Sequence, residues 1–205
     1  MRQQFYEFFT LLLRLVAPAR ASEDVIRALT LDELYTLVDH SGILPYHDPR
    51  VTALVWEIKY YNNPHAAALA GHLLAENIMA AASESLGKTI LIPIPMHSVR
   101  RRERGHNQTE VLCKAALEHA GQYVEYAPHA LVRARNTPRQ QKLPRHERLH
   151  NMANTMTVPQ YALVRGRSCI VIDDVTTTGA TFTEAKRALT VAGAKDVVCI
   201  ALTHS

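Results

Sequence analysis

Hydrophobic positions in the first 82 residues recur at the three- to four-residue spacing of amphipathic helices. Phe5, Phe9, Leu12 and Val16 follow this spacing in the first of them. Thr30 stands where the N-cap of a second helix is expected. The pattern predicts helices over residues 4–16, 31–39, 50–60 and 65–82, with a loop around Gly42, Pro45 and Pro49.

From Gly87 onward the pattern changes to short, continuous apolar runs, which are typical of buried parallel strands. Such runs cover residues 89–92, 168–172 and 197–202, weaker ones cover 123–126 and 130–132, and helical segments cover about 109–120 and 180–192. The last strand, helix and strand form a βαβ unit. The sequence therefore predicts an α/β domain with a central parallel sheet over residues 46–205, preceded by a helical segment over residues 1–45.

Composition narrows the class of protein. Apolar residues make up 47% of the 205 residues and charged residues 20%, which excludes collagen-like, coiled-coil and wholly disordered chains. Cys113, Cys169 and Cys199 are isolated, so we expect no disulfide framework and no zinc ligand set, and a reducing cytoplasm fits them. The eleven histidines show no metal spacing. No apolar run approaches the length of a membrane span, and the run from Phe8 to Leu13 is too short for a signal peptide.

A polar turn follows the strand over residues 168–172. It begins with Asp173 and Asp174 and continues with Val175, Thr176, Thr177, Thr178, Gly179, Ala180 and Thr181. The hydroxyls, the backbone N–H groups near the glycine and the positive end of the next helix can together hold one phosphate. The two aspartates would repel that phosphate but suit hydroxyl groups or a cation beside it. A phosphate next to a diol, as in ribose 5-phosphate, fits this turn; local capping of the turn by the same side chains is the structural alternative.

Other phosphate-binding motifs are missing from the chain. The sequence G-x-x-x-x-G-K-[ST] of nucleotide triphosphatases is absent, and no G-x-G-x-x-G follows either early strand. Kinase and dehydrogenase functions are therefore excluded as interpretations of this turn.

The segment over residues 171–181 resembles the phosphoribosyl-pyrophosphate (PRPP) signature of type I phosphoribosyltransferases. Three further segments, over residues 56–60, 92–108 and 135–151, narrow the resemblance to the ComF family, from about residue 50 to the end. The resemblance implies the Rossmann-like phosphoribosyltransferase fold, ribose hydroxyls on Asp173 and Asp174, and the 5′-phosphate on the turn after them. ComF proteins commonly begin with a four-cysteine zinc module, whereas this chain has no cysteine before Cys113.

Two basic segments complete the expected site. Arginines after the first strand suit the pyrophosphate of PRPP, and the resemblance selects Arg104, Asn107 and Gln108 among the candidates, with Arg101 and Lys59 beside them. A polar loop over residues 134–151 carries Arg135, Arg139, Gln140, Arg145 and Arg148, and we expect it to be mobile when empty and to close over bound polyphosphate. A solvated basic loop or a nucleic-acid contact is the alternative for that segment.

Two functions from different classes remain. The first is a phosphoribosyltransferase that binds PRPP with Mg²⁺, the metal arriving with the substrate, and transfers ribosyl 5-phosphate to an acceptor that the sequence does not identify. The second is a non-catalytic PRPP-binding adaptor, or a protein that binds single-stranded DNA or competence proteins, because the ComF resemblance implies a link to natural competence and DNA uptake. The oligomeric state is not determined by the sequence.

Overall fold

The structure, a computed structural model, describes residues 21–40, 42–85, 87–134 and 154–205. Its centre is a five-stranded sheet in which every neighbouring pair is parallel. The strand order is β1 (Leu44–Pro45), β7 (Asp196–His204), β6 (Ser168–Thr176), β2 (Thr89–Pro93) and β3 (Val124–Tyr126). The predicted α/β fold with a central parallel sheet is confirmed.

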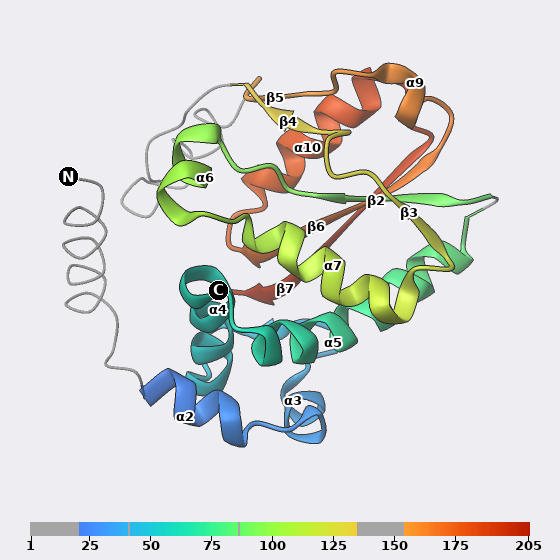
Figure 1. The fold of residues 1–205 in the computed structure, drawn as a ribbon. Helices are drawn as coiled ribbons and strands as arrows, with labels where there is room; N and C mark the ends of the chain where they lie inside the picture. Colours follow the sequence, from blue (N-terminus) through green and yellow to red (C-terminus); the bar gives the residue numbers. More distant parts are fainter. Residues whose placement is uncertain (1–20, 41, 86, 135–153) are drawn as a thin grey trace.

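Helices cover both faces of the sheet (Figure 1). One face carries α4 (Pro49–Tyr61), α5 (Pro64–Ser83) and α7 (Gln108–Ala120), with α2 (Ala21–Ala28) and α3 (Leu31–Leu37) outside them. The other face carries α10 (Ala180–Val191), α9 (Tyr161–Val164) and a small antiparallel pair, β4 (Val132–Arg133) with β5 (Met156–Thr157). The short helix α6 (Ser98–Arg104) follows the carboxyl end of β2.

Alternation along the strands divides the apolar side chains between two cores. Ile90 and Ile92 of β2 belong to the cluster around α10, whereas Leu91 belongs to the cluster around α5 and α7. Successive side chains of a strand point to opposite faces, so a strand covered on both sides has to be apolar at every position. This is why the buried strands are continuous apolar runs in the sequence.

Two features explain how the helical layer packs. Thr30 and Glu33 form a reciprocal capping box at the start of α3, as the sequence predicts. At Gly71, α5 crosses α7 so closely that a Cβ there would lie 2.5 Å from the Cβ of Ala115. A side chain at position 71 would therefore push the two helices apart.

The segment before the first long strand packs on the main core. Ile26 of α2 is 1% exposed and Leu34 of α3 is 0% exposed, and both belong to the cluster that contains α4 and α5. The division into residues 1–45 and 46–205 remains a prediction. The helix expected over residues 4–16 lies outside the described residues.

The remaining differences from the expected elements are short segments and ends. The sequence analysis did not predict α2, α6, α9, β1 or β5, and β4 overlaps the weaker strand expected over 130–132 only at Val132. It ended β6 at Ile172, whereas the strand continues to Thr176 beside β7. Short helices and two-residue bridges have too few positions to develop a period. Among the described residues, no helix has the length and apolarity needed to cross a membrane.

Candidate functional site

The site lies at the carboxyl end of β2, beside β6. Pro93 is in register with Ile172, and the N–H of Ile94 donates to the carbonyl of Ile172 at 2.9 Å. Whereas β2 ends at this register, β6 continues along β7 to Thr176, so Asp173 and the residues after it extend past the end of β2, at the carboxyl edge where open α/β sheets bind ligands. They enclose a pocket of about 210 Å³. Its lining consists of Lys59, Ile94, Pro95, Met96, His97, Arg100, Arg104, Asn107, Gln108, Arg133, Asp173, Asp174, Val175 and Thr181.

Asp173 and Asp174 form the floor of this pocket, each only 7% exposed. The N–H of Asp174 donates to Oδ1 of Asp173 at 2.9 Å, and Thr203 donates to the carbonyl of Asp174 at 3.2 Å. Oδ2 of Asp174 is buried and accepts no hydrogen bond from the described residues. A buried carboxylate oxygen without a donor is costly, so a ligand that donates a hydrogen bond there would be bound favourably.

The two carboxyl groups differ in charge. Burial and the negative charge of Asp174 raise the pKa of Asp173 well above its ordinary value. Burial also opposes ionisation of Asp174, but Lys59 and the contact with Asp173 outweigh it and hold the pKa of Asp174 below its ordinary value. Asp174 is therefore the more readily ionised of the two, and Asp173 is the one that keeps its proton to higher pH.

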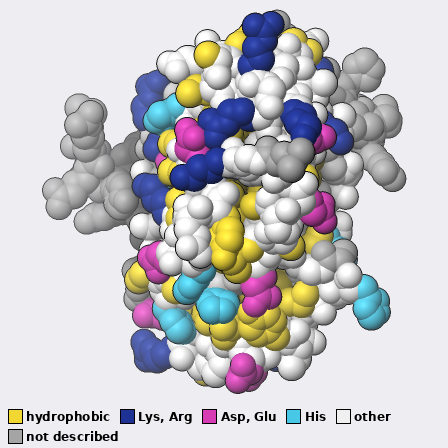
Figure 2. Space-filling model, turned by 90° about the vertical axis from the view of Figure 1, so that its right-hand side faces the viewer, with side chains coloured by type: hydrophobic (Ala, Val, Ile, Leu, Met, Phe, Trp, Pro, Cys, Tyr) yellow, Lys and Arg dark blue, Asp and Glu magenta, His cyan; other side chains and the backbone are white. Residues whose placement is uncertain are grey.

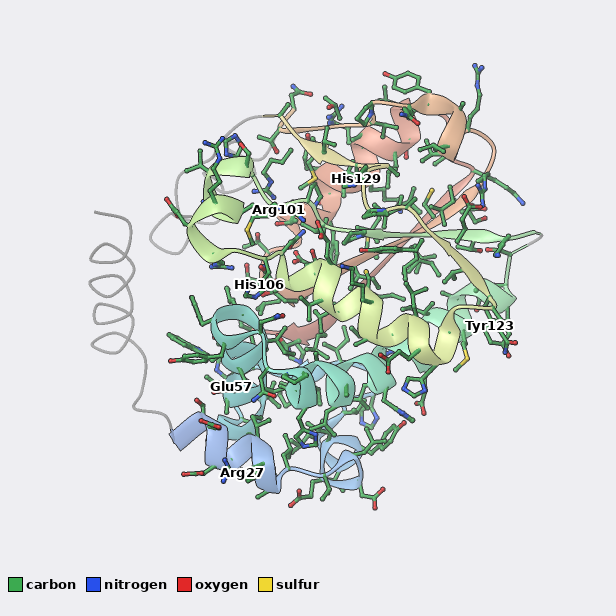
Figure 3. The ribbon with its side chains drawn as sticks, in the orientation of Figure 1. Arg27, Glu57, Arg101, His106, Tyr123 and His129 are labelled. Atoms are coloured by element: carbon green, nitrogen blue, oxygen red, sulfur yellow. The ribbon has the colours of Figure 1, made fainter. Side chains whose placement is uncertain are left out.

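Lys59 supplies the positive charge nearest to that carboxylate. Its Nζ lies 3.8 Å from Oδ2 of Asp174. The lysine comes from the last turn of α4, which is fixed from outside because Nε2 of His106 lies 3.0 Å from the carbonyl oxygen of Ile58. Figure 3 labels His106 beside the segment that leads into α7 and Glu57 on α4 below it.

The turn after the two aspartates presents the start of α10 to the pocket. Gly179 is its N-cap with φ +72°, a left-handed conformation that favours glycine, and a Cβ there would meet no atom within 4 Å. No side chain caps the helix, although Oγ1 of Thr178 lies 3.4 Å from the N–H of Ala180. Of the predicted phosphate turn, Val175 and Thr181 line the pocket; Thr176, Thr177, Thr178, Gly179 and Ala180 are not part of its lining.

The predicted pyrophosphate residues divide into three groups. Arg104 and Gln108 line the pocket and are joined by a hydrogen bond of 3.1 Å. Asn107 also lines it, but its side chain caps α7 and donates to the carbonyl of Ile94, so the amide is engaged in holding the loop. Arg101 points elsewhere: it makes a two-pronged ion pair with Glu110, at 2.5 and 3.0 Å, and does not line the pocket.

Arg100, one of the arginines after the first strand that were expected to meet the pyrophosphate, lines the pocket together with His97, whereas sequence reasoning missed Arg133. Arg133 belongs to β4, and burial lowers the pKa of its guanidinium while Asp173 acts in the opposite direction. The only signal for it in the sequence is an arginine placed directly after the apolar run 130–132, ahead of the basic loop. The predicted loop residues Arg135, Arg139, Gln140, Arg145 and Arg148 lie outside the described residues.

The β4–β5 pair is fastened to α10 by one buried acid. Glu184, 3% exposed, accepts a hydrogen bond of 2.9 Å from the N–H of Met156. It also pairs with Arg187, whose Nη2 donates to the carbonyl of Met156 at 3.0 Å. Acid and arginine together bind both backbone groups of Met156, and this contact fixes the strand pair that carries Arg133.

The acids of the pocket bear on how a metal ion could be held. Within the described ranges, no group of three or more His, Cys, Asp or Glu side chains could hold a metal ion. Two adjacent carboxyl groups are the only acids in the pocket lining. Mg²⁺ binds with one or two carboxylates plus the phosphates of a substrate, so the site fits a Mg²⁺ ion that arrives on a polyphosphate.

Comparison with known proteins gives the following relatives. No family model matches the chain. It is 31% identical over 153 residues to the DNA utilization protein YhgH of Salmonella typhi, and 28% identical over 151 residues to YhgH of Escherichia coli K12. These matches cover 74% and 73% of this chain, and 66% and 65% of the relatives, just under two thirds of their length.

Solved structures give weaker similarities. A hypoxanthine phosphoribosyl transferase of Trypanosoma cruzi matches 68% of this chain and 65% of its own at 11% identity, with a TM-score of 0.43. A glutamine PRPP amidotransferase of B. subtilis matches 72% of this chain and 30% of its own at 15% identity, with a TM-score of 0.44. At such scores, the function of the site has to be argued from its own geometry. By sequence, the chain is a homologue of the bacterial proteins named DNA utilization protein YhgH.

Proposed function

We propose that this chain is a ComF-like phosphoribosyltransferase that binds PRPP with Mg²⁺ and transfers ribosyl 5-phosphate to an acceptor, releasing pyrophosphate. One observation carries the proposal. Two buried, adjacent carboxyl groups lie in a pocket that Lys59, Arg100 and Arg104 also line. Acids on the floor and bases in the wall suit a ligand that joins hydroxyl groups to phosphates.

The charge state of the pair favours a diol over a bare anion. Asp174, the more readily ionised of the two, can accept a hydrogen bond from one hydroxyl at Oδ2, which Lys59 approaches to 3.8 Å but which accepts no hydrogen bond from the described residues. Asp173, when it carries a proton, can donate to the oxygen of a second hydroxyl or share that proton with Asp174. A phosphate at the same position would face the negative charge of Asp174, so the acids define the sugar end of the ligand.

The 5′-phosphate would lie at the start of α10. The helix has 12 residues, no side chain of the described residues bonds at its N-cap, and Thr181 in its first turn lines the pocket. The positive end of a helix stabilises an anion there, and Gly179 leaves space for its oxygens. The proposal includes the expected role of the threonines over residues 176–178, whose hydroxyls would bind the 5′-phosphate.

The pyrophosphate would then extend toward α6. Arg104, Arg100, Gln108 and Lys59 lie on that side of the pocket, and guanidinium groups match phosphate oxygens in geometry. Mg²⁺, when bound to the pyrophosphate, would neutralise part of its charge. Asp174 is the carboxylate of this chain that could contact such an ion.

The reaction is a displacement at the anomeric carbon of the ribose. The bond from this carbon to the pyrophosphate oxygen breaks with its electron pair, while a lone pair of the acceptor forms the new bond. No side chain of the pocket is needed as nucleophile. The chain holds the ribose on the aspartates, holds the leaving group with Arg104 and Lys59, and screens the charge that develops.

Two arginines of one helix provide a matched test of the pyrophosphate position. Arg104 lines the pocket, whereas Arg102 is exposed on the same helix and does not. Arg104→Gln should bind Mg²⁺-pyrophosphate about ten-fold more weakly or worse, because a charged hydrogen-bond donor is lost. Arg102→Gln should bind it as the wild type does. If calorimetry gives equal affinities for the two variants, the pyrophosphate does not bind on the Arg104 side of the pocket.

A second candidate is an adaptor that binds PRPP without catalysis and acts in DNA uptake. The relatives' printed name, DNA utilization protein, favours it. A variant with glutamine at four loop arginines separates the two candidates; the positions are Arg135, Arg139, Arg145 and Arg148. If the protein is an adaptor that binds DNA through this loop, the variant loses DNA affinity. If it is a transferase, the variant loses pyrophosphate release. PRPP that binds but is never consumed, with any nucleobase, amine or nucleic-acid acceptor, would favour the adaptor.

A further inference from the structure

Three flat side chains form a stack at the rim of the pocket. The rings of Trp56 and Tyr60, one turn apart on α4, lie with centroids 4.7 Å apart and planes inclined by 40°. The guanidinium carbon of Arg104 lies 5.2 Å from the centroid of Tyr60, and Nζ of Lys59 lies 6.0 Å from it. Arg104 and Lys59 line the pocket, so the stack leads from the pocket to the surface of α4.

Core packing does not account for the two rings. Both are half-buried, and among the described residues neither belongs to the apolar clusters on the two faces of the sheet or to the side chains packed against them. Trp56 is the only tryptophan of the chain. Large apolar rings are ordinarily placed in a core, where they bury most area, so a tryptophan outside it points to a ligand.

The stack is held rigidly against the pocket. The contact of His106 with the carbonyl of Ile58 fixes the last turn of α4 to the segment between α6 and α7. The hydrogen bond from Arg104 to Gln108 fixes the guanidinium at the other end. Preformed aromatic surfaces bind flat ligands without a large ordering cost.

We propose that Trp56 and Tyr60 are a stacking site for the bases of single-stranded nucleic acid, whose phosphates lie along Lys59 and Arg104. Every base has a π face, and aromatic side chains beside cationic ones are the common device for binding a single strand without reading its sequence. The cations favour a polyanion over an apolar peptide as the occupant. The inference rests on the proposed function in one respect, because it places the nucleic acid next to the pocket that is proposed to bind the sugar and phosphates of PRPP.

Because Trp56 is the sole tryptophan, its fluorescence reports directly on the site. We would titrate the protein with a twelve-residue oligothymidylate and with a twelve-residue abasic strand that keeps the phosphates but has no bases. Stacking predicts strong quenching by the thymidylate and little by the abasic strand. Equal quenching by the two strands, or none by either, would overturn the proposal.

Variants locate the interaction. Tyr60→Leu should weaken binding of a labelled oligothymidylate about ten-fold, the lower part of the range for losing one stacked base, and Tyr60→Phe, which keeps the ring, should restore it. Tyr123→Leu is the matched control, because Tyr123 is 45% exposed and lies near the amino end of the sheet, away from α6 (Figure 3). Equal losses for Tyr60→Leu and Tyr123→Leu, or no loss for Tyr60→Leu, would also contradict the proposal.

The test separates this inference from the proposed function. Binding of PRPP with Mg²⁺ to the wild-type protein is measured by calorimetry without nucleic acid, so it reports on the pocket alone. PRPP binding without base-dependent quenching would overturn the stacking site and leave the proposed function standing. Base-dependent quenching without PRPP binding would do the reverse.

Discussion

Replacing Asp173 by asparagine should stabilise the protein in the absence of ligand. In the wild type, Asp173 is 7% exposed, and burial and the charge of Asp174 raise its pKa. The folded state therefore takes up a proton that the unfolded state does not hold, and the free energy of unfolding falls as pH rises from the ordinary aspartate pKa through the raised one.

The amide copies the protonated acid. In Asp173→Asn, Oδ1 can still accept from the N–H of Asp174, and Nδ2 can donate toward the carboxylate of Asp174 without a proton from solution. The variant should match the wild type near pH 4 and be more stable by about 0.5–2 kcal/mol at pH 8, the range found when a strained functional position is relieved.

Urea denaturation at several pH values measures this difference. Asp196→Asn is the control, since Asp196 is exposed at the start of β7, and its effect should not grow with pH. If Asp173→Asn is less stable than the wild type at pH 8, or if its effect is the same at pH 4 and pH 8, the assigned proton is wrong.

Three further changes test the framework around the site. Glu184→Ala should lower the free energy of unfolding by about 2 kcal/mol, through loss of its bonds to Met156 and Arg187; because the pKa of Glu184 is lowered, this contribution should disappear as acid titration protonates it. Leu34→Ala should cost about 2–5 kcal/mol in urea denaturation, since Leu34 is fully buried, and a near-zero cost would detach α3 from the core. Gly71→Ala should lower the melting temperature despite the higher helix propensity of alanine, because its Cβ would overlap α7; an unchanged or raised melting temperature would mean that the helices are not in this contact.

The sequence predicted the parts of the fold that have a long period or a buried run. Helices α4, α5, α7 and α10 and strands β2, β6 and β7 lie within a few residues of their expected ranges. Their signals come from many positions that must all face a core. The short elements at the pocket rim have too few positions to produce such a signal.

The sequence named the acids of the pocket floor and part of its wall, the side chains of Lys59, Arg104, Asn107 and Gln108. Asp173 and Asp174 stand directly after a recognisable strand, so their edge of the sheet follows from the topology. Arg101 and Arg104 lie on the same short helix, and only the three-dimensional contact with Glu110 shows that Arg101 is turned away from the pocket. Arg133 reaches the pocket from a two-residue strand whose partner, β5, is distant in the sequence.

Electrostatics on the opposite side of the molecule differ from those of the pocket. Figure 2 views the face on the right of Figure 1, at the amino ends of the strands, where most Lys and Arg side chains lie in the upper half and Asp and Glu side chains are scattered over both halves. Arg167, for example, is paired there with Glu125 at 2.7 Å. This face is mixed in sign, whereas the pocket lining gathers four Lys and Arg side chains around two adjacent acids, so we expect a polyanion at the pocket.

Calorimetric titration of PRPP with Mg²⁺ tests the central claim most directly. The wild type and the Asp196→Asn control should bind PRPP, and the double variant Asp173→Asn/Asp174→Asn should lose that binding while remaining folded. Absence of PRPP binding by the folded wild type, or undiminished binding by the double variant, would contradict the account.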